Sequence, residues 1–500
     1  MFILFVLAFF LRFYKISQNP PGLYWDETSI GYNAYSILKS GKDEYGKFLP
    51  VSFKAFGEYK LPVYIYFTVF TTAIFGPSEF AVRFPSAACG VLTVVAFYFL
   101  VAELFASRRL AFLSSLLLAI SPWHLQFSRA GFEANLALFF LILGALLFLK
   151  SRYQPILLLA SSLFFSLTLY TYSTARLFTP LFILVLLTIW GKKLWLATKA
   201  RKTLAFFLLP FVAFYLALFL SPHLTTRFTV VSAFHGYSFF QWPAIFLKNY
   251  LSHFSFDFLF FKGDGFARHG VEKMGNLYFF EIPFILIGFY QLIKSADKKT
   301  KAFVLAWLSL SPLAASLADP SPHSLRSLTM VVPMTIISGF GLFQIISWVG
   351  VHFKKAFLQN LIYTTIIAII VYFFLNYLHL YYVHYPKTSA LAWQDGNKEM
   401  VEEVLKRKDG YERIYVSDYL GQTYIYFLLY GRIDPDFYQE NRTSDGFGKY
   451  HFIGKNWPQK LDNDSLWVFS FDDKFIPEGQ LLKEIRITNG DMIYNLWGNK

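Results

Sequence analysis

Long apolar stretches recur along this 500-residue chain, and they constrain its fold more than any other feature. An α-helix needs about 20 mostly apolar residues to cross the hydrocarbon core of a bilayer. About eleven stretches approach or reach that length, and the first lacks the features of a cleaved signal peptide. The predicted spans are residues 1–16, 80–104, 110–124, 134–149, 155–172, 177–191, 203–220, 277–293, 302–318, 328–348 and 359–382.

The composition agrees with a membrane protein. Hydrophobic residues make up 55% of the chain and charged residues 16%, whereas a soluble domain carries about 25% charge. Mean hydropathy is +0.41, which excludes a disordered chain. A single cysteine, Cys89, excludes a disulfide scaffold. The net charge of +14 is attributed to cytoplasmic loops rather than to a nucleic-acid partner.

Basic residues gather in every second connection between the predicted spans. Connections 105–109, 150–154, 192–202, 294–301 and 350–358 carry fifteen Lys and Arg residues against one acid, Asp297. The short connections that alternate with these contain only three Lys or Arg residues, which are Arg129, Arg176 and Arg326. The positive-inside rule therefore places the basic set in the cytoplasm. The loops over 17–79 and 221–276, and the tail, are then expected outside a multi-pass protein of the cytoplasmic membrane.

The tail has a different pattern from the rest of the chain. An amphipathic helix is predicted over 398–407, a strand over 413–417, a second helix over 421–430 and a strand over 466–471. Residues 484–497 alternate around Asn489-Gly490, which predicts a hairpin. The expected architecture is mainly α: a transmembrane helical bundle over 1–385, followed by a small extracytoplasmic α/β domain over 386–500.

No phosphate-binding loop of the form GxxxxGK[ST] occurs, so no directly bound nucleotide cofactor is expected. Charged residues instead concentrate in the predicted outer loops. Asp26 and Glu27 follow the first span, where one alternative is a helix N-cap at Asp26. Carboxylates beside aromatic residues at a membrane face are costly and often functional. Glu58 and Lys60 lie further along the same loop. They are expected either to form an ion pair with each other, or to act separately, with Glu58 as a metal ligand and Lys60 as a contact to a lipid phosphate.

Two tight outer turns carry further candidates. Arg129 and Glu133 are four residues apart, which fits a helix-end salt bridge or a second outward carboxylate. Tyr172 and Arg176 lie in the next outer turn, where snorkelling accounts for the arginine as well as substrate binding does.

The large outer loop and the last outer turn add a cluster of polar residues. Asp264, Arg268 and His269 occur together between glycines, and His269 is a candidate metal ligand. His323 and Arg326 lead into span ten, where Arg326 either snorkels or captures a phosphate. A carboxylate can act as general base toward an acceptor hydroxyl, and cations can stabilise a departing phosphate. This set predicts transfer from a phosphate-linked lipid donor.

These residues resemble those of the GT-C glycosyltransferases. The Trp25-Asp26-Glu27 stretch, the GEYKLP stretch, the Arg-x-x-x-Glu turn, the GDG…RH loop and the PHSLR turn carry the resemblance. It is strongest to the bacterial branch with protein O-mannosyltransferases and the aminoarabinose and galacturonic acid transferases of lipid A. It covers about residues 1–385.

The resemblance implies an integral-membrane glycosyltransferase that uses a polyprenyl-phosphate sugar donor. Transfer would be inverting and would take place on the outer face, with Asp26 as the general base and Glu27 and Glu133 as further catalytic candidates. Lys60 would hold the lipid phosphate, and Glu58 corresponds to an acid linked to a divalent metal cation, the candidate cofactor. The acceptor, whether glycan, lipid or protein, stays open.

Two other functions are compatible with a polytopic chain. A transporter or flippase of lipid-linked glycans would place essential charges at mid-membrane within the spans. A receptor-like scaffold would use the tail but leave the outer carboxylates without a role. The gathering of charges in the outer loops favours transfer.

Overall fold

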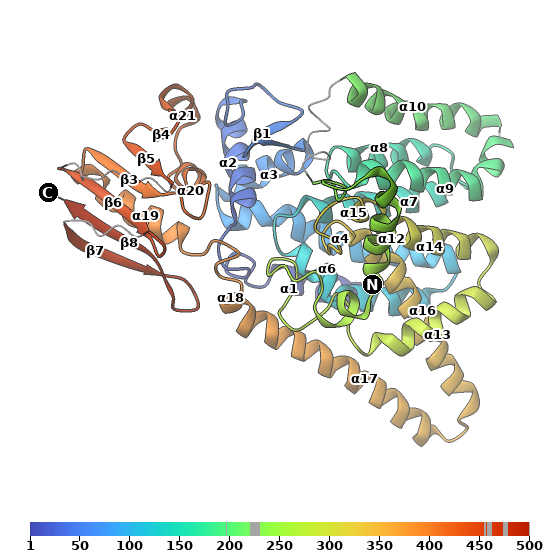
Figure 1. Ribbon diagram of the computed structural model, residues 1–500. Helices are drawn as coiled ribbons and strands as arrows, with labels where there is room; N and C mark the ends of the chain where they lie inside the picture. The colour runs from blue at the N-terminus through green and yellow to red at the C-terminus, as the bar shows by residue number, and fades with distance from the viewer. Residues whose placement is uncertain (197, 221–230, 455–456, 458–462, 474–478, 500) are drawn as a thin grey trace. The chain divides into compact units, whose positions relative to one another are not determined.

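The computed structural model describes all residues except 197, 221–230, 455–456, 458–462, 474–478 and 500 (Figure 1). The chain forms two compact units. The first comprises Met1–Tyr14 and Ser86–Leu380, and the second comprises Lys15–Pro85 and Tyr381–Lys500. Part of the predicted loop 221–276 lies outside the described residues.

The first unit is built from helices. Its α-helices, together with α4 which begins in the second unit, are α1 (Phe2–Phe13), α4 (Glu79–Phe105), α5 (Arg108–Ile120), α6 (Pro122–Ser128), α7 (Glu133–Lys150), α8 (Leu157–Leu169), α9 (Ala175–Leu196), α10 (Thr198–Leu220), α12 (Trp242–Ser252), α13 (Glu281–Ser295), α14 (Lys298–Leu310), α15 (Leu313–Ser316), α16 (Val331–His352) and α17 (Ala356–His379). Its short 3₁₀ and π turns are η2 (Phe239–Gln241), η3 (Asp257–Phe261) and η4 (Leu328–Met330), and the π turn η5 (Leu380–His384) continues from Leu380 into the second unit.

Five helical segments of the described chain are long and apolar enough to cross a membrane: Glu79–Phe105, Glu133–Lys150, Ala175–Lys192, Leu328–His352 and Ala356–Thr388. The pair α5 and α6, bent by 59° between Ile120 and Pro122, is either a sixth, broken span or a re-entrant loop. Helices α1, α3, α8 and the Lys202–Leu216 part of α10 are apolar but shorter. The chain is therefore a multi-pass membrane protein. A helix occurs at each of the eleven predicted spans, but only five or six satisfy the length and composition of a full span.

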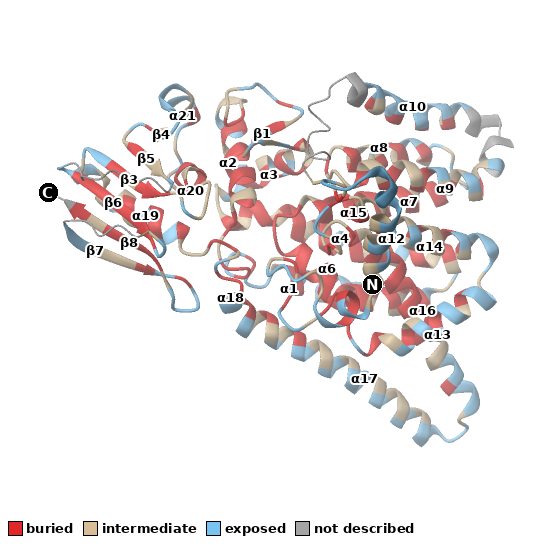
Figure 2. Cartoon of the chain, viewed as in Figure 1, coloured by how far each residue is buried: buried red, intermediate tan, exposed pale blue. Residues whose placement is uncertain are grey.

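The helices of the first unit pack closely where small residues meet. Gly288 of α13 and Gly341 of α16 face the partner helix so tightly that a Cβ on either would lie within 2 Å of a backbone carbonyl oxygen. Ser161 of α8 donates a 2.8 Å hydrogen bond to the Gly144 carbonyl of α7. Small residues of this kind allow membrane helices to approach each other. Figure 2 shows α7 and most of α16 buried, whereas α17 is largely exposed.

The second unit combines the first loop with the tail. Its helices are α2 (Trp25–Ser40), α3 (Pro62–Phe75), α18 (Tyr385–Thr388), α19 (Asn397–Arg407), η6 (Lys408–Gly410), α20 (Tyr424–Tyr430) and α21 (Pro435–Asn441). Its strands are β1 (Phe53–Ala55), β2 (Glu58–Lys60), β3 (Arg413–Ser417), β4 (Gly446–Phe447), β5 (Tyr450–Ile453), β6 (Ser465–Ser470), β7 (Gln480–Arg486) and β8 (Met492–Asn499). The apolar helix α3 was missed by the sequence analysis because its 14 residues are too few for a predicted span.

The tail forms a six-stranded mixed sheet in the order β4-β5-β3-β6-β8-β7. Strand β3 is parallel to β5 and β6, and β8 is antiparallel to β6 and β7. Every residue of β6 is buried, as expected for a strand covered on both faces. Helix α19 buries Asn397, Met400, Val401 and Val404, the one-sided spacing of an amphipathic helix. The predicted helix 398–407, the strands 413–417 and 466–471 and the hairpin around Asn489-Gly490 are confirmed.

Candidate active site

The first cluster of candidate residues lies in the second unit, at the N-terminus of α2. Asp26 and Glu27 stand in the first helical turn, where the macrodipole stabilises carboxylates. The N-cap is Tyr24, so the alternative in which Asp26 caps this helix is wrong. The Asp26 carboxylate forms an ion pair with the Lys60 ammonium. The Asp26 side chain is 36% exposed and that of Lys60 is 8% exposed, so the carboxylate is open to solvent and its partner is enclosed.

The neighbouring carboxylate is held quite differently. Glu27 Oε1 and Oε2 each lie 3.0 Å from a nitrogen of the Arg83 guanidinium, and both side chains are fully buried. Arg83 also donates to the carbonyls of Ile16, Pro20 and Gly22. A bidentate pair of this kind fixes geometry as well as charge. Glu27 therefore anchors α2 to α4, and its geometry favours positioning over direct catalysis.

Glu58 and Lys60 lie on the short strand β2, which pairs with β1 in an antiparallel ladder. Alternate residues of a strand share a face, so these two side chains point to one side and Tyr59 to the other. Lys60 is buried and Glu58 is half-buried. The strand thus delivers Lys60 to Asp26.

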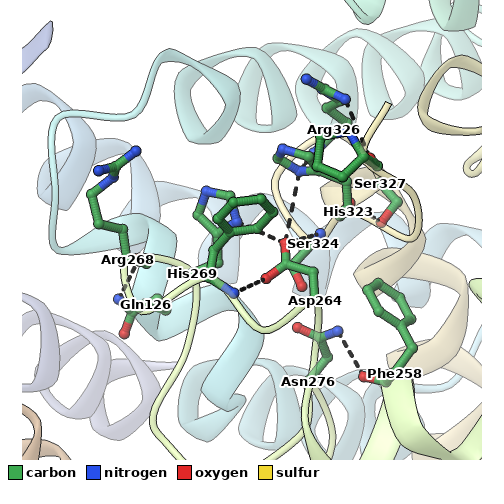
Figure 3. A network of polar contacts seen from close by, with 12 residues as sticks. Gln126, Phe258, Asp264, Arg268, His269, Asn276, His323, Ser324, Arg326 and Ser327 are labelled. Atoms are coloured by element: carbon green, nitrogen blue, oxygen red, sulfur yellow. Dashed lines mark hydrogen bonds and ion pairs between the residues drawn. The ribbon is translucent and has the colours of Figure 1, made fainter. Parts of the chain in front are cut away.

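A second cluster lies in the first unit, where the loop after η3 meets the turn before η4 (Figure 3). The Asp264 carboxylate lies 2.7 Å from His269 Nδ1 and 3.8 Å from His323 Nδ1, and it accepts a 2.7 Å hydrogen bond from the Ser324 N–H. Gly263 and Gly265 have φ of +64° and +79°, a backbone conformation that glycine adopts at little cost. The two glycines let the loop turn sharply on either side of Asp264.

The cluster is electrostatically asymmetric. Burial raises the pKa of Asp264, but the hydrogen bonds that its carboxylate accepts from His269 and from the Ser324 N–H outweigh this effect, so the pKa lies below its ordinary value. Burial, reinforced by the neighbouring side chains of His269 and Arg326, lowers the pKa of His323 to about 2. Asp264 is therefore an anion next to a neutral imidazole at neutral pH.

Asp264, His269 and His323 could hold a metal ion. Their ligand atoms all lie within 4.8 Å of one another. One carboxylate and two imidazoles are a common donor set for Zn²⁺ and similar divalent ions, with further positions left for water or substrate. The residues present therefore fit a divalent cation. The predicted metal ligands Glu58 and His269 belong to different units.

The remaining predicted residues of the first unit are arranged around backbone groups. Arg129 is 1% exposed and donates to the carbonyls of Leu11 and Tyr14, which ties α6 to α1. Arg176 donates to the Leu169 carbonyl, which joins the ends of α8 and α9. Arg268 is half-buried, and Figure 3 shows its guanidinium pointing away from Asp264. Glu133 is half-buried and begins α7.

Tyr172 and Arg326 share a narrow slot in the first unit. Its volume is about 20 Å³, room for little more than a water molecule. Thr168, Thr179 and Thr329 add hydroxyl groups to a mostly apolar lining. Arg326 also donates to the carbonyls of Asp319 and Pro320, which holds its guanidinium at the turn before η4.

Sequence reasoning missed three fully buried polar or charged residues, Arg83, Arg12 and His253. Arg83 is the partner of Glu27, and its position within a predicted apolar span was the available signal. Arg12 lies 2.7 Å from His124 Nδ1 and donates to the Ala119 carbonyl near the bend between α5 and α6. His253 accepts a hydrogen bond from the His323 N–H. Burial lowers the pKa of His253 to about 4, so it is neutral.

Known proteins were compared with the chain in sequence and in structure. Residues 60–221 match a family described as dolichyl-phosphate-mannose-protein mannosyltransferase. No curated protein sequence matches the chain. Among solved structures, ArnT from Cupriavidus metallidurans bound to undecaprenyl phosphate has a TM-score of 0.55 at 13% identity, with 99% of this chain and 97% of ArnT covered. The chain has a GT-C fold.

A second GT-C structure supports the same fold. The Archaeoglobus fulgidus oligosaccharyltransferase, tethered to an acceptor peptide containing the NVT sequon, has a TM-score of 0.53 at 15% identity. The match covers 87% of this chain but only 62% of the oligosaccharyltransferase, so the chain spans less than two thirds of that protein. The GT-C resemblance stated from the sequence is confirmed for the fold.

Proposed function

We propose that this GT-C protein is an integral-membrane glycosyltransferase. It transfers a sugar from a polyprenyl-phosphate donor to an acceptor on the outer face of the cytoplasmic membrane. The match of residues 60–221 to a mannosyltransferase family, and the undecaprenyl phosphate bound by ArnT, support a lipid-phosphate donor. The acceptor peptide held by the oligosaccharyltransferase supports transfer to a separate acceptor. The basic connections support the outward orientation of residues 17–79.

The contrast between the two adjacent carboxylates carries this proposal. Glu27 is fully buried and locked to Arg83, whereas Asp26 is 36% exposed beside a buried lysine. A rigid support beneath an accessible carboxylate is what a positioned general base requires. Asp26 is therefore the catalytic base, and Glu27 is a positioning residue.

The reaction is an inverting displacement. Asp26 accepts the proton of the acceptor hydroxyl as that oxygen forms a bond to the anomeric carbon of the donor sugar. The bond from the anomeric carbon to the phosphate oxygen breaks, and polyprenyl phosphate leaves with the electron pair. Lys60 orients Asp26 through their ion pair, and its ammonium offsets negative charge on the phosphate.

The other predicted residues have proposed roles in substrate binding, in positioning or in metal binding. Arg326 and Tyr172 at their slot are candidate contacts for a phosphate or hydroxyl of the substrate. Arg129 and Arg176 support helix ends through backbone carbonyls, so they act by positioning. Asp264, His269 and His323 would hold a divalent cation, which when bound would add positive charge toward a phosphate.

The observed placement of charge favours transfer over transport. Arg12 lies in the last turn of α1, Arg83 near the start of α4 and Glu281 in the first turn of α13. These charges lie toward helix ends rather than at mid-span, where a transport pathway would need them.

A reconstituted transfer assay tests the proposal. The purified protein in nanodiscs is supplied with radiolabelled polyprenyl-phosphate mannose, aminoarabinose or galacturonic acid and an envelope extract as the acceptor source. Transfer is measured as label in the extract together with released polyprenyl phosphate. We expect Asp26→Asn to lower the rate by about 10²–10⁴-fold, the usual contribution of a general base.

Asp436→Asn is the matched control, because Asp436 also pairs with a lysine in the second unit, at 3.2 Å from Lys42, but both side chains are exposed. Its rate should equal that of the wild type. Undiminished transfer by a folded Asp26→Asn protein excludes Asp26 as the base. Translocation of a fluorescent polyprenyl phosphate in proteoliposomes, with no sugar transfer from any donor, would establish the flippase instead.

A further inference from the structure

A polar cavity of about 220 Å³ lies within the second unit, apart from the Asp26–Lys60 pair. It is lined by residues 17–18 and 21–23, by the residues that begin α19, by α20, and by Glu79 and Thr488. The volume is more than ten times the roughly 10–15 Å³ that one water molecule needs. It is smaller than the roughly 300–1,000 Å³ of pockets for drug-sized ligands. A molecule of about the size of one monosaccharide fits this range.

The charges at the cavity disfavour an anion. Glu79 forms a 2.9 Å ion pair with Lys398, and Asp395 accepts hydrogen bonds from the backbone and hydroxyl groups of Thr488. Two carboxylates and one ammonium therefore line the space, a net charge of −1. A phosphate or carboxylate ligand would meet this negative charge without a free cation to balance it.

The same lining suits hydroxyl groups. Gln394 and Asn397 carry amides, and Tyr426 and Tyr430 present two stacked rings with centroids 6.4 Å apart. The first N–H groups of α19, which begins at Asn397, have no acceptor within the helix. A hydroxyl both donates and accepts, so it can bond with carboxylates, amides and N–H groups together. Aromatic faces add contact with the C–H faces of a sugar ring.

The lining of the cavity is also hydrogen-bonded to the backbone at the start of α2. Gln394 Oε1 accepts hydrogen bonds from the Trp25 N–H at 2.8 Å and from the Tyr426 hydroxyl at 2.7 Å. Trp25 directly precedes Asp26. A ligand that contacts Gln394 would thus be connected, through one hydrogen bond, to the backbone next to Asp26, the proposed base.

We propose that this cavity is a binding site for one neutral sugar residue. The proposal concerns equilibrium binding, so it does not depend on the transfer reaction. Ser17 and Gln18 are exposed at the cavity, which allows the space to be blocked without replacing a buried side chain.

The test is ligand-observed NMR on the full-length protein in nanodiscs, with methyl α-mannoside, methyl β-glucoside and methyl β-galactoside as probes and glucose 6-phosphate as the anionic comparison. Ser17→Trp fills the cavity. Glu412→Trp adds the same side chain at an exposed position of the second unit that does not line it. Melting temperatures verify that both variants fold, and Gln18→Trp replaces Ser17→Trp if that variant does not.

We expect at least one neutral methyl glycoside to bind the wild type and Glu412→Trp equally, and to bind Ser17→Trp at least tenfold more weakly. Absence of binding by all three glycosides, or equal binding by Ser17→Trp, overturns the proposal. Tighter binding of glucose 6-phosphate overturns the assignment of a neutral ligand. A protein that fails to transfer sugar but shows the expected binding contradicts only the proposed enzyme activity.

Discussion

Glu27 and Arg83 form a fully buried, two-pronged ion pair with both N···O distances at 3.0 Å. Arg83 donates in addition to three backbone carbonyls of the segment that leads into α2. One guanidinium therefore holds together the start of α4, the segment 16–22 and the helix that carries Asp26. Its loss leaves a carboxylate and three carbonyls buried without their donor.

The first prediction concerns the stability of this arrangement. Removing one partner of a buried ion pair costs about 3–5 kcal/mol, because the other charge stays buried and uncompensated. We expect Arg83→Met to lower the melting temperature more than Glu27→Ala, since only the former also strips the carbonyls of their donor. Lys42→Met breaks an exposed pair with Asp436 and should change stability by less than about 1 kcal/mol. The reverse order of Arg83→Met and Glu27→Ala would contradict this reading.

The second prediction concerns the contact between α13 and α16. A Cβ at Gly288 would lie 1.9 Å from the Ile337 carbonyl oxygen, and one at Gly341 would lie 1.8 Å from that of Phe284. The two backbones must separate to admit a methyl group, so we expect Gly288→Ala and Gly341→Ala each to cost about 1–3 kcal/mol. At Gly191 of α9 the nearest atom to a Cβ is 3.5 Å away. Gly191→Ala should therefore be neutral or stabilising by up to about 1 kcal/mol in the same thermal unfolding assay.

The third prediction concerns metal binding by the cluster of Asp264, His269 and His323. We expect the purified protein, exposed to Zn²⁺ and then desalted, to retain about one equivalent by elemental analysis, and to lose it to EDTA. Each of Asp264→Asn, His269→Ala and His323→Ala should weaken retention at least tenfold, since three donors are the minimum for such a site. His352→Ala removes an exposed histidine at the end of α16 and serves as the control. Full retention of Zn²⁺ by all three variants would place the ion elsewhere.

The fourth prediction concerns pH and the buried carboxyl group of Glu44. It accepts hydrogen bonds from the Tyr424 hydroxyl at 2.8 Å and from the Asn33 amide at 3.4 Å. Burial raises the pKa of Glu44 to about 7, while those two hydrogen bonds and Arg442 oppose the rise and Asp43 adds to it. The native state thus keeps a proton between about pH 4.5 and 7 that the unfolded chain has lost, so stability falls as pH rises through that window and levels off above it.

Glu44→Gln removes this titration and keeps an amide of the same shape. We expect the variant to match the wild type near pH 5 and to melt at a higher temperature at pH 8. Asp434→Asn, which changes an exposed carboxylate at the start of α21, should leave the pH profile unaltered. An identical pH profile for wild type and Glu44→Gln would show that Glu44 is ionised throughout.

Several elements of the fold followed from local sequence alone. The apolar stretches located a helix at every predicted span, because a helix satisfies its backbone within one segment. The alternation around Asn489-Gly490 predicted the β7–β8 hairpin, since the turn and the register are both local. The membrane class of the protein and its GT-C resemblance were also accessible from residue types and their order.

Other features depend on contacts between distant parts of the chain. No local pattern shows that Glu27 meets Arg83, 56 positions away, or that Lys60 reaches Asp26 across 34 positions. The sequence alone does not distinguish the neighbouring carboxylates of Asp26 and Glu27. Only the tertiary structure buries Glu27 and leaves Asp26 open to solvent. Burial and charge pairing set the chemistry of a carboxylate, and both are properties of the folded surroundings rather than of the residue.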